Sequence, residues 1–359
     1  MTLPRQARGT SPPISSPSEP DNIRRWDGRT PGHYEVWYLT LNHRASETGT
    51  WIRYALEAPL AGEAHAEVWF AQFDARRPDR TFGIHRAFPI SDMVAESDPF
   101  AVSIAGARAL LRHDRARGEL AGGGHRAAWD LSWSPAPRTH RHMPSLFYRT
   151  FGRRGALTES TVLSPNLDVA MRGWIEVDGK RLELDGEPGG QTHLWGRKHA
   201  HAWAWGRATA FESHPGAAIE AVSARLMKAG RVTPPLTVLS LYLDGEELHF
   251  NRLSSMPRSR ARYGTGFYRF AAAGPTARVE GEFSCRPEDM VMAEYQDPDG
   301  EPLFCANTEV GDLRVSVFRR TRPFGRWREA TVLHAPRTAH FEVARRERDP
   351  AIGKLHTRL

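Results

Sequence analysis

Large and small side chains alternate regularly along residues 191–212. Every second residue from His193 to Phe211 is polar or aromatic, whereas every second residue from Ala200 to Ala210 is alanine or glycine. A β-strand sends successive side chains to opposite faces, so the pattern predicts a single strand. Because tryptophan and histidine combine an apolar body with a polar tip, we interpret the face that carries them as the wall of a binding site. Trp195, Trp203 and Trp205 should then share one side of the strand.

Shorter runs with the same period of two fill much of the remaining chain. Residues 50–57 and 65–73 alternate in this way, and Asp-Gly pairs at 178–179 and 244–245 predict tight hairpin turns. No window of useful length has a clear helical period, and the chain is rich in glycine (31) and proline (26). These observations predict an all-β protein with two strand-rich halves. Residues 134–166, which are rich in proline and lack periodicity, are expected to form a long loop or an arm between the halves.

Composition narrows the class of protein further. The chain has 359 residues and a net charge of +7, but basic and acidic residues are interleaved, and no nucleic-acid reader motif is found. A mild attraction to anionic membrane surfaces stays open beside an ordinary soluble surface. Two cysteines, Cys285 and Cys305, form no disulfide framework, so a reducing, cytoplasmic location is expected. No apolar run approaches the length of a membrane-spanning helix, and the N-terminus has no secretory signal.

The middle of the chain carries a series of motifs that resemble a known family. The order of the four segments is more specific than any of them alone. They resemble AttH/CrtC-type proteins, which are two-domain and lipocalin-like and include carotenoid 1,2-hydratase (hydroxyneurosporene synthase). Tocopherol cyclase and some decalin-forming Diels–Alderases look related. The segments are Gly173-Trp174-Ile175-Glu176-Val177-Asp178-Gly179, Leu184-Asp185-Gly186, His193-Leu194-Trp195-Gly196 and Trp203-Ala204-Trp205.

The resemblance implies a fold and a type of chemistry. The fold would be two lipocalin-like (calycin-type) antiparallel β-barrels packed together, with a disordered N-terminal tail. The chemistry would be redox-neutral: a hydro-lyase or cyclase would protonate an alkene of a hydrophobic isoprenoid or polyketide-like substrate in a barrel pocket, without a metal or nicotinamide. The expected boundaries are 1–30 for the tail, 31–188 and 189–346 for the two domains, and 347–359 for a basic tail.

The resemblance also points to functional residues, with one departure. His193 and Trp195 match the His-x-Trp motif that matters in the hydratases, but Thr192 stands where many members have aspartate before that histidine. The acid must then come from elsewhere, and Glu212 or Glu220 is a substitute. The expected catalytic residues are His193, Trp195, Glu212 and Asp244, and the expected substrate-binding residues are Trp203, Trp205, Arg207, His199, His201 and Tyr242.

A metal site at the histidines and two other functions of the pocket are alternatives to this interpretation. His199 and His201, with His193, could be metal ligands, but a zinc site needs three or four converging groups, and no carboxylate or cysteine lies at a matching position. We therefore predict no metal and no other cofactor.

Besides the enzyme, two functions remain open for the same pocket. One is a non-catalytic carrier of a lipid or apolar small molecule, and the other is a pericyclase that merely folds a polyene.

Overall fold

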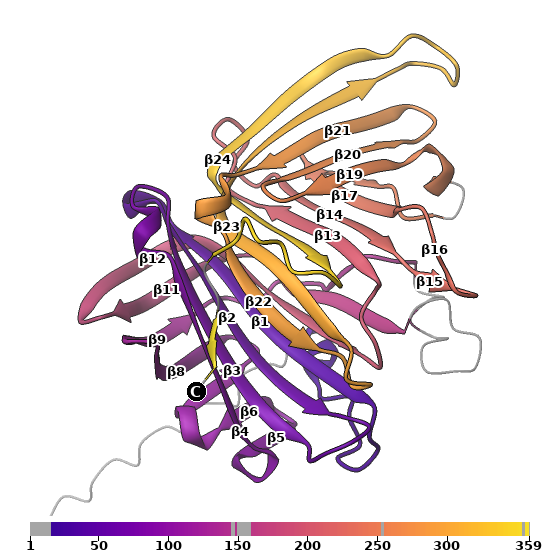
Figure 1. Cartoon of the computed structure of the whole chain (residues 1–359). Helices are drawn as coiled ribbons and strands as arrows, with labels where there is room; N and C mark the ends of the chain where they lie inside the picture. The colour runs from indigo at the N-terminus through magenta and orange to yellow at the C-terminus, as the bar shows by residue number, and fades with distance from the viewer. Residues whose placement is uncertain (1–15, 145–147, 149–158, 253–254, 354–355, 359) are drawn as a thin grey trace, which may run out of the picture.

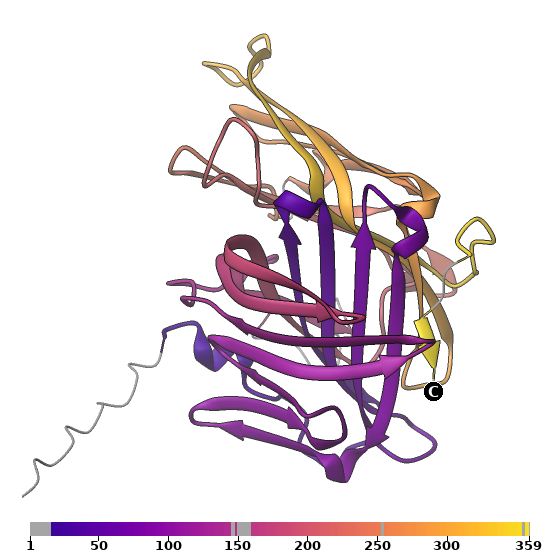
Figure 2. The same ribbon diagram turned by 90° about the vertical axis from the view of Figure 1, so that its left-hand side faces the viewer.

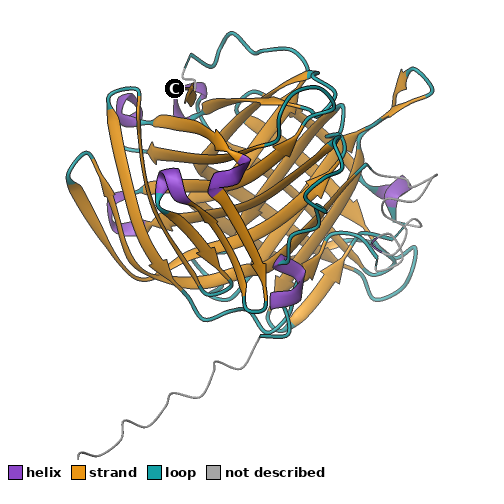
Figure 3. Ribbon diagram, turned by 90° about the horizontal axis from the view of Figure 1, so that it is seen from below, coloured by secondary structure: helices purple, strands orange, loops and turns teal. Residues whose placement is uncertain are grey.

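Antiparallel strands make up most of the protein (Figures 1 and 3). The computed structural model describes residues 16–144, 148, 159–252, 255–353 and 356–358. The helices with described bounds are single 3-10 turns, and no helix among the described residues is long and apolar enough to cross a membrane. The expected all-β class is therefore confirmed. The 3-10 turns are η1 (Glu19–Asn22), η2 (Arg44–Ser46), η3 (Pro78–Arg80), η4 (Ile90–Asp92), η5 (Ala105–Ala107), η6 (Met256–Arg258) and η7 (Pro287–Asp289).

The first sheet curls into a nearly closed barrel (Figure 2). Its order is β25-β4-β3-β2-β1-β12-β11-β9-β8-β7-β6-β5, with β10 beside β11. Inward side chains such as Trp37, Phe70 and Trp129 form its apolar core. Its strands are β1 (His33–His43), β2 (Thr48–Ala58), β3 (His65–Asp74), β4 (Phe82–Pro89), β5 (Met93–Ser97), β6 (Phe100–Ile104), β7 (Ala109–Arg112), β8 (Arg115–Gly122), β9 (His125–Ser132), β10 (His140–Arg141), β11 (Ser160–Val177), β12 (Lys180–Gly196) and β25 (His356–Arg358).

The second sheet has the order β18-β17-β14-β13-β24-β23-β21-β20-β19, with β22 beside β23. Phe270, Phe283 and Phe341 lie in its own apolar core. A small hairpin of β15 (Met227–Lys228) and β16 (Arg231–Val232) stands apart. The strands of the sheet are β13 (Ala202–Ala208), β14 (Ala218–Arg225), β17 (Leu236–Leu243), β18 (Glu246–His249), β19 (Arg260–Gly264), β20 (Phe267–Ala273), β21 (Ala277–Ser284), β22 (Val291–Gln296), β23 (Pro302–Arg319) and β24 (Arg328–Arg345).

The outer face of β1–β3 packs against the second sheet. Trp51 and Trp69 of the first sheet share an apolar cluster with Tyr295 and Cys305 of the second. Strands β2 and β3 are therefore buried on both faces, because one face fills the barrel and the other meets β22 and β23 (Figure 1). Cys285 and Cys305 are both free thiols.

The predicted single strand over residues 191–212 is two strands in two sheets. β12 ends at Gly196 in the first sheet, and β13 begins at Ala202 in the second. The turn between them is fixed by Asp297, whose carboxylate accepts a hydrogen bond from the His199 backbone N–H (2.9 Å). Alternation within a strand cannot continue through such a turn. Trp195 therefore faces the inside of the first barrel, and the expectation that it shares a face with Trp203 and Trp205 is wrong.

Within β13 the alternation itself holds. Ala204 and Ala208 face the core of the second sheet, where an added Cβ on Gly206 would come 2.5 Å from the Phe283 ring. Trp205 and Arg207 face the first sheet instead, because Trp205 packs edge-on against Tyr38 and Arg207 hydrogen-bonds to Thr40. The flat face of β13, which carries the alanines and Gly206, therefore lies against the core of the second sheet. The face that carries Trp205 and Arg207 lies between the two sheets.

The ends of the chain differ from expectation. Residues 1–15 lie outside the described part, but residues 16–30, which were assigned to the disordered tail, pack on the first barrel with Asn22 fully buried and Trp26 nearly so. Their Pro- and Ser-rich composition suits the turn η1 and its contacts as well as it suits disorder. At the other end, His356–Arg358 forms β25 beside β4.

β12 carries the first sheet to Gly196, beyond the expected boundary at residue 188.

Both predicted Asp-Gly hairpins are confirmed. Asp178 and Gly179 connect β11 to β12, and Asp244 and Gly245 connect β17 to β18. All four residues have positive φ, between 50° and 80°, which is the conformation that two-residue hairpin turns require. The loop expected over residues 134–166 contains strands, because His140–Arg141 forms β10 on the edge of β11 and β11 itself begins at Ser160.

Candidate active site

A cavity of about 440 Å³, partly open to solvent, lies between the two sheets. Its walls come from the segment after β10, the start of β11, the 198–201 turn, β14, β17 and the β15–β16 hairpin. The strand faces that line the cavity point away from the barrel cores. They are nevertheless apolar, because they face the other sheet and not open solvent. We call this space the inter-sheet cavity. Its apolar lining includes Val162, Val222, Leu226, Leu236, Val238 and Met256.

A buried carboxylate lies behind one wall of this cavity. Glu220 on β14 accepts a hydrogen bond from Trp205 Nε1 (2.7 Å) and from Ser164 Oγ (3.2 Å). Two histidines face the same carboxylate: His142 Nε2 lies 3.0 Å from Oε1, and His140 Nε2 lies 3.6 Å from Oε2. We call these five residues the Glu220 cluster. His142 also lines the inter-sheet cavity, so the cluster has a route to a bound molecule.

The outer nitrogens of the two histidines fix their orientation. His142 Nδ1 lies 3.3 Å from the Val162 carbonyl oxygen, which can only accept, so Nδ1 carries a hydrogen. Nε2 then faces a carboxylate without an aligned hydrogen bond. His140 Nδ1 lies 2.7 Å from the Tyr242 hydroxyl. Both rings therefore present Nε2 to Glu220.

Charge on the cluster is set by burial and by these neighbours. Burial opposes ionisation of Glu220, but His142, His140 and Arg207 together hold its pKa well below the usual range. Burial, helped by His142, lowers the pKa of His140 to about 3. At neutral pH Glu220 is therefore ionised and His140 neutral. His142 faces the Glu220 carboxylate through Nε2 and the Val162 carbonyl oxygen through Nδ1, so both of its nitrogens point towards acceptor atoms.

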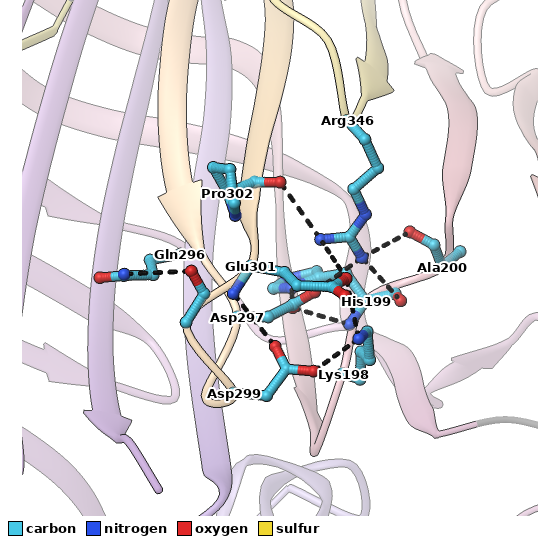
Figure 4. Close-up of polar contacts among 10 residues, drawn as sticks. Lys198, His199, Ala200, Gln296, Asp297, Asp299, Glu301, Pro302 and Arg346 are labelled. Atoms are coloured by element: carbon cyan, nitrogen blue, oxygen red, sulfur yellow. Dashed lines mark hydrogen bonds and ion pairs between the residues drawn. The ribbon is translucent and has the colours of Figure 1, made fainter. Parts of the chain in front are cut away.

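Polar groups also hold the opposite rim of the cavity (Figure 4). Asp297 binds the His199 ring (2.7 Å) and Arg346 (2.7 Å), and Lys198 pairs with Asp299 (2.5 Å) and Glu301 (2.9 Å). These contacts tie the 198–201 turn to the turn after β22. The rim is thus fixed by side chains of the turn between the two sheets and of the second sheet.

Comparison with known proteins identifies the family. The tocopherol cyclase-like family matches residues 126–344, which is more than half of the chain. The chain belongs to the tocopherol cyclase-like family. The match includes β9 to β24 and all five residues of the Glu220 cluster.

Other relatives carry less functional information. Uncharacterized proteins of two Mycobacterium tuberculosis strains, H37Rv and CDC 1551, are 29% identical over 300 residues, covering 82% of this chain and 84% of theirs. A crystal structure from Nitrosomonas europaea, described as an AttH protein, is 14% identical with a TM-score of 0.54 and covers 94% of this chain and 99% of its own. It supports the two-barrel fold. Kievitone hydratase from Nectria haematococca (10% identity, TM-score 0.48, 92% of each chain) is too distant to bear on function.

The position at which this family member departs from the expected motif faces the Glu220 cluster. Thr192 is buried, and its hydroxyl lies 3.0 Å from Ser164 Oγ, which in turn donates to Glu220. Thr192 is the β12 residue at which the resemblance led us to expect an aspartate, and Glu220 brings a carboxylate to the same polar region from the opposite sheet.

His193 and Trp195 lie in the first barrel, away from this region. His193 Nδ1 is 2.7 Å from the Asp21 carbonyl oxygen and Nε2 is 2.9 Å from Glu35, while its ring stacks on Trp37. It is fully buried and lines neither cavity described here. Trp195 packs beside it under Arg25. Their catalytic roles stay predictions, and the packing suits a structural role.

Of the six expected substrate-binding residues, two line the inter-sheet cavity and the others lie behind its wall or elsewhere between the sheets. His199 and His201 line the inter-sheet cavity. Trp205 and Tyr242 do not line it, but they bond to Glu220 and His140 behind its wall. Trp203 donates to Glu342 (2.7 Å) and Arg207 reaches Thr40, both between the sheets.

Glu212 and Asp244, the other expected catalytic residues, are exposed. Glu212 pairs with His334 at 3.1 Å, and Asp244 occupies the β17–β18 turn. Neither lines the inter-sheet cavity. Of the two substitute acids suggested by the sequence, the structure brings only Glu220 to the cavity wall.

Sequence reasoning missed His140, His142 and Ser164. They fall in a segment expected to be a loop, and no periodic pattern marks it. The spacing His140-x-His142 was the available signal, because residues two apart on a strand share a face. The same spacing matters for metals: ligand atoms of His140, His142 and Glu220 lie within 4.8 Å of one another, a set that could hold zinc. The set weighed from the sequence does not converge, because His193 lies in the first barrel.

A second cavity of about 370 Å³ lies between β2–β4 and the turn after β22. Arg53 sits there between the rings of Trp69 (5.2 Å) and Tyr295 (4.3 Å) and pairs with Glu57 at 3.6 Å. Burial and the neighbouring Glu67 raise the pKa of Glu57. Since its charged groups already pair with one another, this cavity suits an apolar substrate less well than the inter-sheet cavity.

Proposed function

We propose that this protein is a redox-neutral hydratase or cyclase that binds an apolar, isoprenoid- or polyketide-like substrate in the inter-sheet cavity. The observation that carries the proposal is the Glu220 cluster, an ionised carboxylate and two histidines at the wall of an apolar space. Membership of the tocopherol cyclase-like family supports chemistry of this class. The cavity volume is sufficient for a substrate of that kind.

The residues suggest a sequence of proton transfers. His142, which lies on the wall of the cavity, would donate a proton to a substrate alkene. The resulting carbocation would form beside the Glu220 carboxylate, which stabilises positive charge. Water, or a hydroxyl group of the substrate, would then attack the cation and return a proton to His142. Hydration adds one water and cyclisation forms one ring bond, and neither changes the oxidation level overall.

The support around the cluster fits this role. Trp205 and Ser164 donate to Glu220, and Tyr242 orients His140, so none of the three reacting side chains needs to reorganise. His140 is neutral and lies beside His142, so it could relay the proton of the attacking water to His142. The acid therefore would not be His193, the first choice from the sequence.

Glu220→Gln tests the proposal, with the exposed Glu212→Gln as a matched control. We expect Glu220→Gln to lower turnover by roughly a hundredfold or more, the usual scale for losing one group that stabilises charge in the transition state, with the affinity for substrate nearly unchanged. Binding would be measured by tryptophan fluorescence, and conversion of a panel of isoprenoid alkenes and polyenes by mass spectrometry. Added water marks hydration, and an unchanged mass with a new retention time marks cyclisation.

The other two functions predict different results. A carrier would bind members of the panel and convert none of them. A pericyclase would convert a polyene equally well as Glu220→Gln, because folding of the substrate needs no proton transfer. Full activity in Glu220→Gln would therefore overturn the proposed mechanism.

A further inference from the structure

The hairpin between β23 and β24 ends in a tip unlike the rest of the surface. Both strands extend away from the second sheet (Figure 1), and residues 320–327 connect them. Phe324 at the tip is 96% exposed, whereas the next most exposed large apolar residue, Leu60, is 63% exposed. Its backbone has a φ of 71°, a left-handed conformation that is uncommon for phenylalanine. The ring therefore stands in solvent, on a turn that does not favour it.

Arginines surround this phenylalanine. Arg322, Arg326 and Arg328 are exposed, and no ion pair or hydrogen bond is described for their side chains. Arg320 lies over Trp327 at 4.1 Å and donates to the Pro275 carbonyl oxygen (2.6 Å), which braces the base of the tip. Glu329 is the single acidic residue from 320 to 329. The tip thus presents one aromatic ring within a ring of positive charge.

We propose that this tip docks the protein on anionic lipid membranes. Phe324 would enter the interfacial region of the bilayer, and Arg322, Arg326 and Arg328 would contact lipid phosphates. Aromatic side chains favour that interface, and basic residues close to an anionic surface each strengthen binding about fivefold. The inference goes beyond the proposed function and does not depend on it.

The size of the tip favours a membrane over a protein partner. A stable protein interface buries about 800 Å² on each side and needs a broad complementary surface. A single projecting turn offers far less area, but a membrane accepts a small wedge because lipid closes around it. The positive charge matches anionic headgroups, and an acidic protein surface would leave the exposed ring without a pocket.

Vesicle binding by the full-length protein tests the inference. We expect the protein to float with vesicles of equal parts phosphatidylcholine and phosphatidylglycerol, and at least tenfold less with phosphatidylcholine alone. High salt should weaken the binding, because exposed charges are screened. Phe324→Ser should lower binding about tenfold or more, and Arg322→Glu/Arg326→Glu at least about twentyfold.

Two variants serve as controls for the loss of an exposed apolar side chain and for a change in net charge. Val94→Ser removes an exposed apolar side chain on β5, and Arg112→Glu/Arg117→Glu makes the same charge change on β7 and β8. Both should bind vesicles as the wild type does. Equal losses in tip and control variants would reduce the effect to net charge and overturn the docking role of the tip.

A second apolar and basic place provides the sharpest alternative. Met227 and Val232 on the β15–β16 hairpin are 48% and 41% exposed beside Lys228 and Arg231. If Met227→Ser/Val232→Ser abolished binding while Phe324→Ser did not, the membrane contact would belong to that hairpin. A wild type that binds neither vesicle would also overturn the inference. Circular dichroism of each variant confirms that the fold is retained.

Discussion

His193 and His142 both face carboxylates but differ in their access to a ligand. His193 lies between Glu35 and the Asp21 carbonyl oxygen, and both of its nitrogens face acceptors within 2.9 Å. His142 faces Glu220 at a similar distance, but it also lines the inter-sheet cavity. His193 therefore connects η1 to the barrel through the Asp21 carbonyl oxygen. His142, in contrast, has part of its side chain on the wall of the cavity.

Glu35 should make stability depend on acid pH. Burial opposes its ionisation, but His193 and His33 lower its pKa from 4.5 to about 2. A lowered pKa stabilises the native state above the unfolded value, and this stabilisation is lost as pH falls from about 4.5 towards 2. The loss amounts to about 3 kcal/mol. Glu35→Gln should therefore lower the free energy of unfolding at pH 7 and flatten its fall between pH 5 and 2.

Denaturant titrations at several pH values provide the measurement. The exposed Glu183→Gln on β12 is the matched control and should keep the slope of the wild type. If Glu35→Gln retained the full acid sensitivity, other carboxyl groups would account for it. His193→Ala should also lower stability, because it leaves Glu35 buried without its main partner.

At the scale of elements, local patterns predicted strands and turns but not their partners. The alternation along β13 and the two Asp-Gly turns were readable, because each depends on neighbouring residues only. The break between Gly196 and Ala202 was not, because it depends on Asp297, far along the sequence. The site was missed for the same reason: His142 and Glu220 meet only when β10 and β14 face each other across two sheets.

The flat face of β13 provides a test of the packing. An added Cβ on Gly206 would come 2.5 Å from the Phe283 ring, a distance that requires the ring or the strand to move. We expect Gly206→Ala to lower the free energy of unfolding by about 1–3 kcal/mol, the usual cost of overpacking a core. Gly353→Ala, with no atom within 4 Å of the new Cβ, should have little effect. Urea denaturation of both variants gives the comparison, and equal stabilities would mean that the core yields freely.

For the whole molecule, buried charges between the sheets should make the two barrels unfold together. Arg207 of the second sheet is 1% exposed and reaches Thr40 of the first, and it lies near the buried carboxyl group of Glu309 and near Asp168 of the first sheet. Neither barrel alone offers these groups the same partners. We therefore infer that the sheets form one cooperative unit.

Calorimetry can test this cooperativity. The wild type should unfold in one transition, and Arg207→Ala should lower the stability of that whole transition by about 3 kcal/mol or more, since it removes a buried charge that others depend on. Arg314→Ala, an exposed arginine on β23, is the control and should change stability little. Two separate transitions, of which Arg207→Ala shifts only one, would contradict the single unit.

The pairing of β25 with β4 has a consequence for how the protein is made. Residues 356–358 complete the sheet beside residues 83–85, so almost the whole intervening sequence must be synthesised first. Until then the backbone N–H and C=O groups along that side of β4 have no partner on the nascent chain. An open strand edge invites pairing with other chains. During translation, this edge is therefore the place where a ribosome-bound chaperone, or a neighbouring chain on the same polysome, would meet the unfinished barrel.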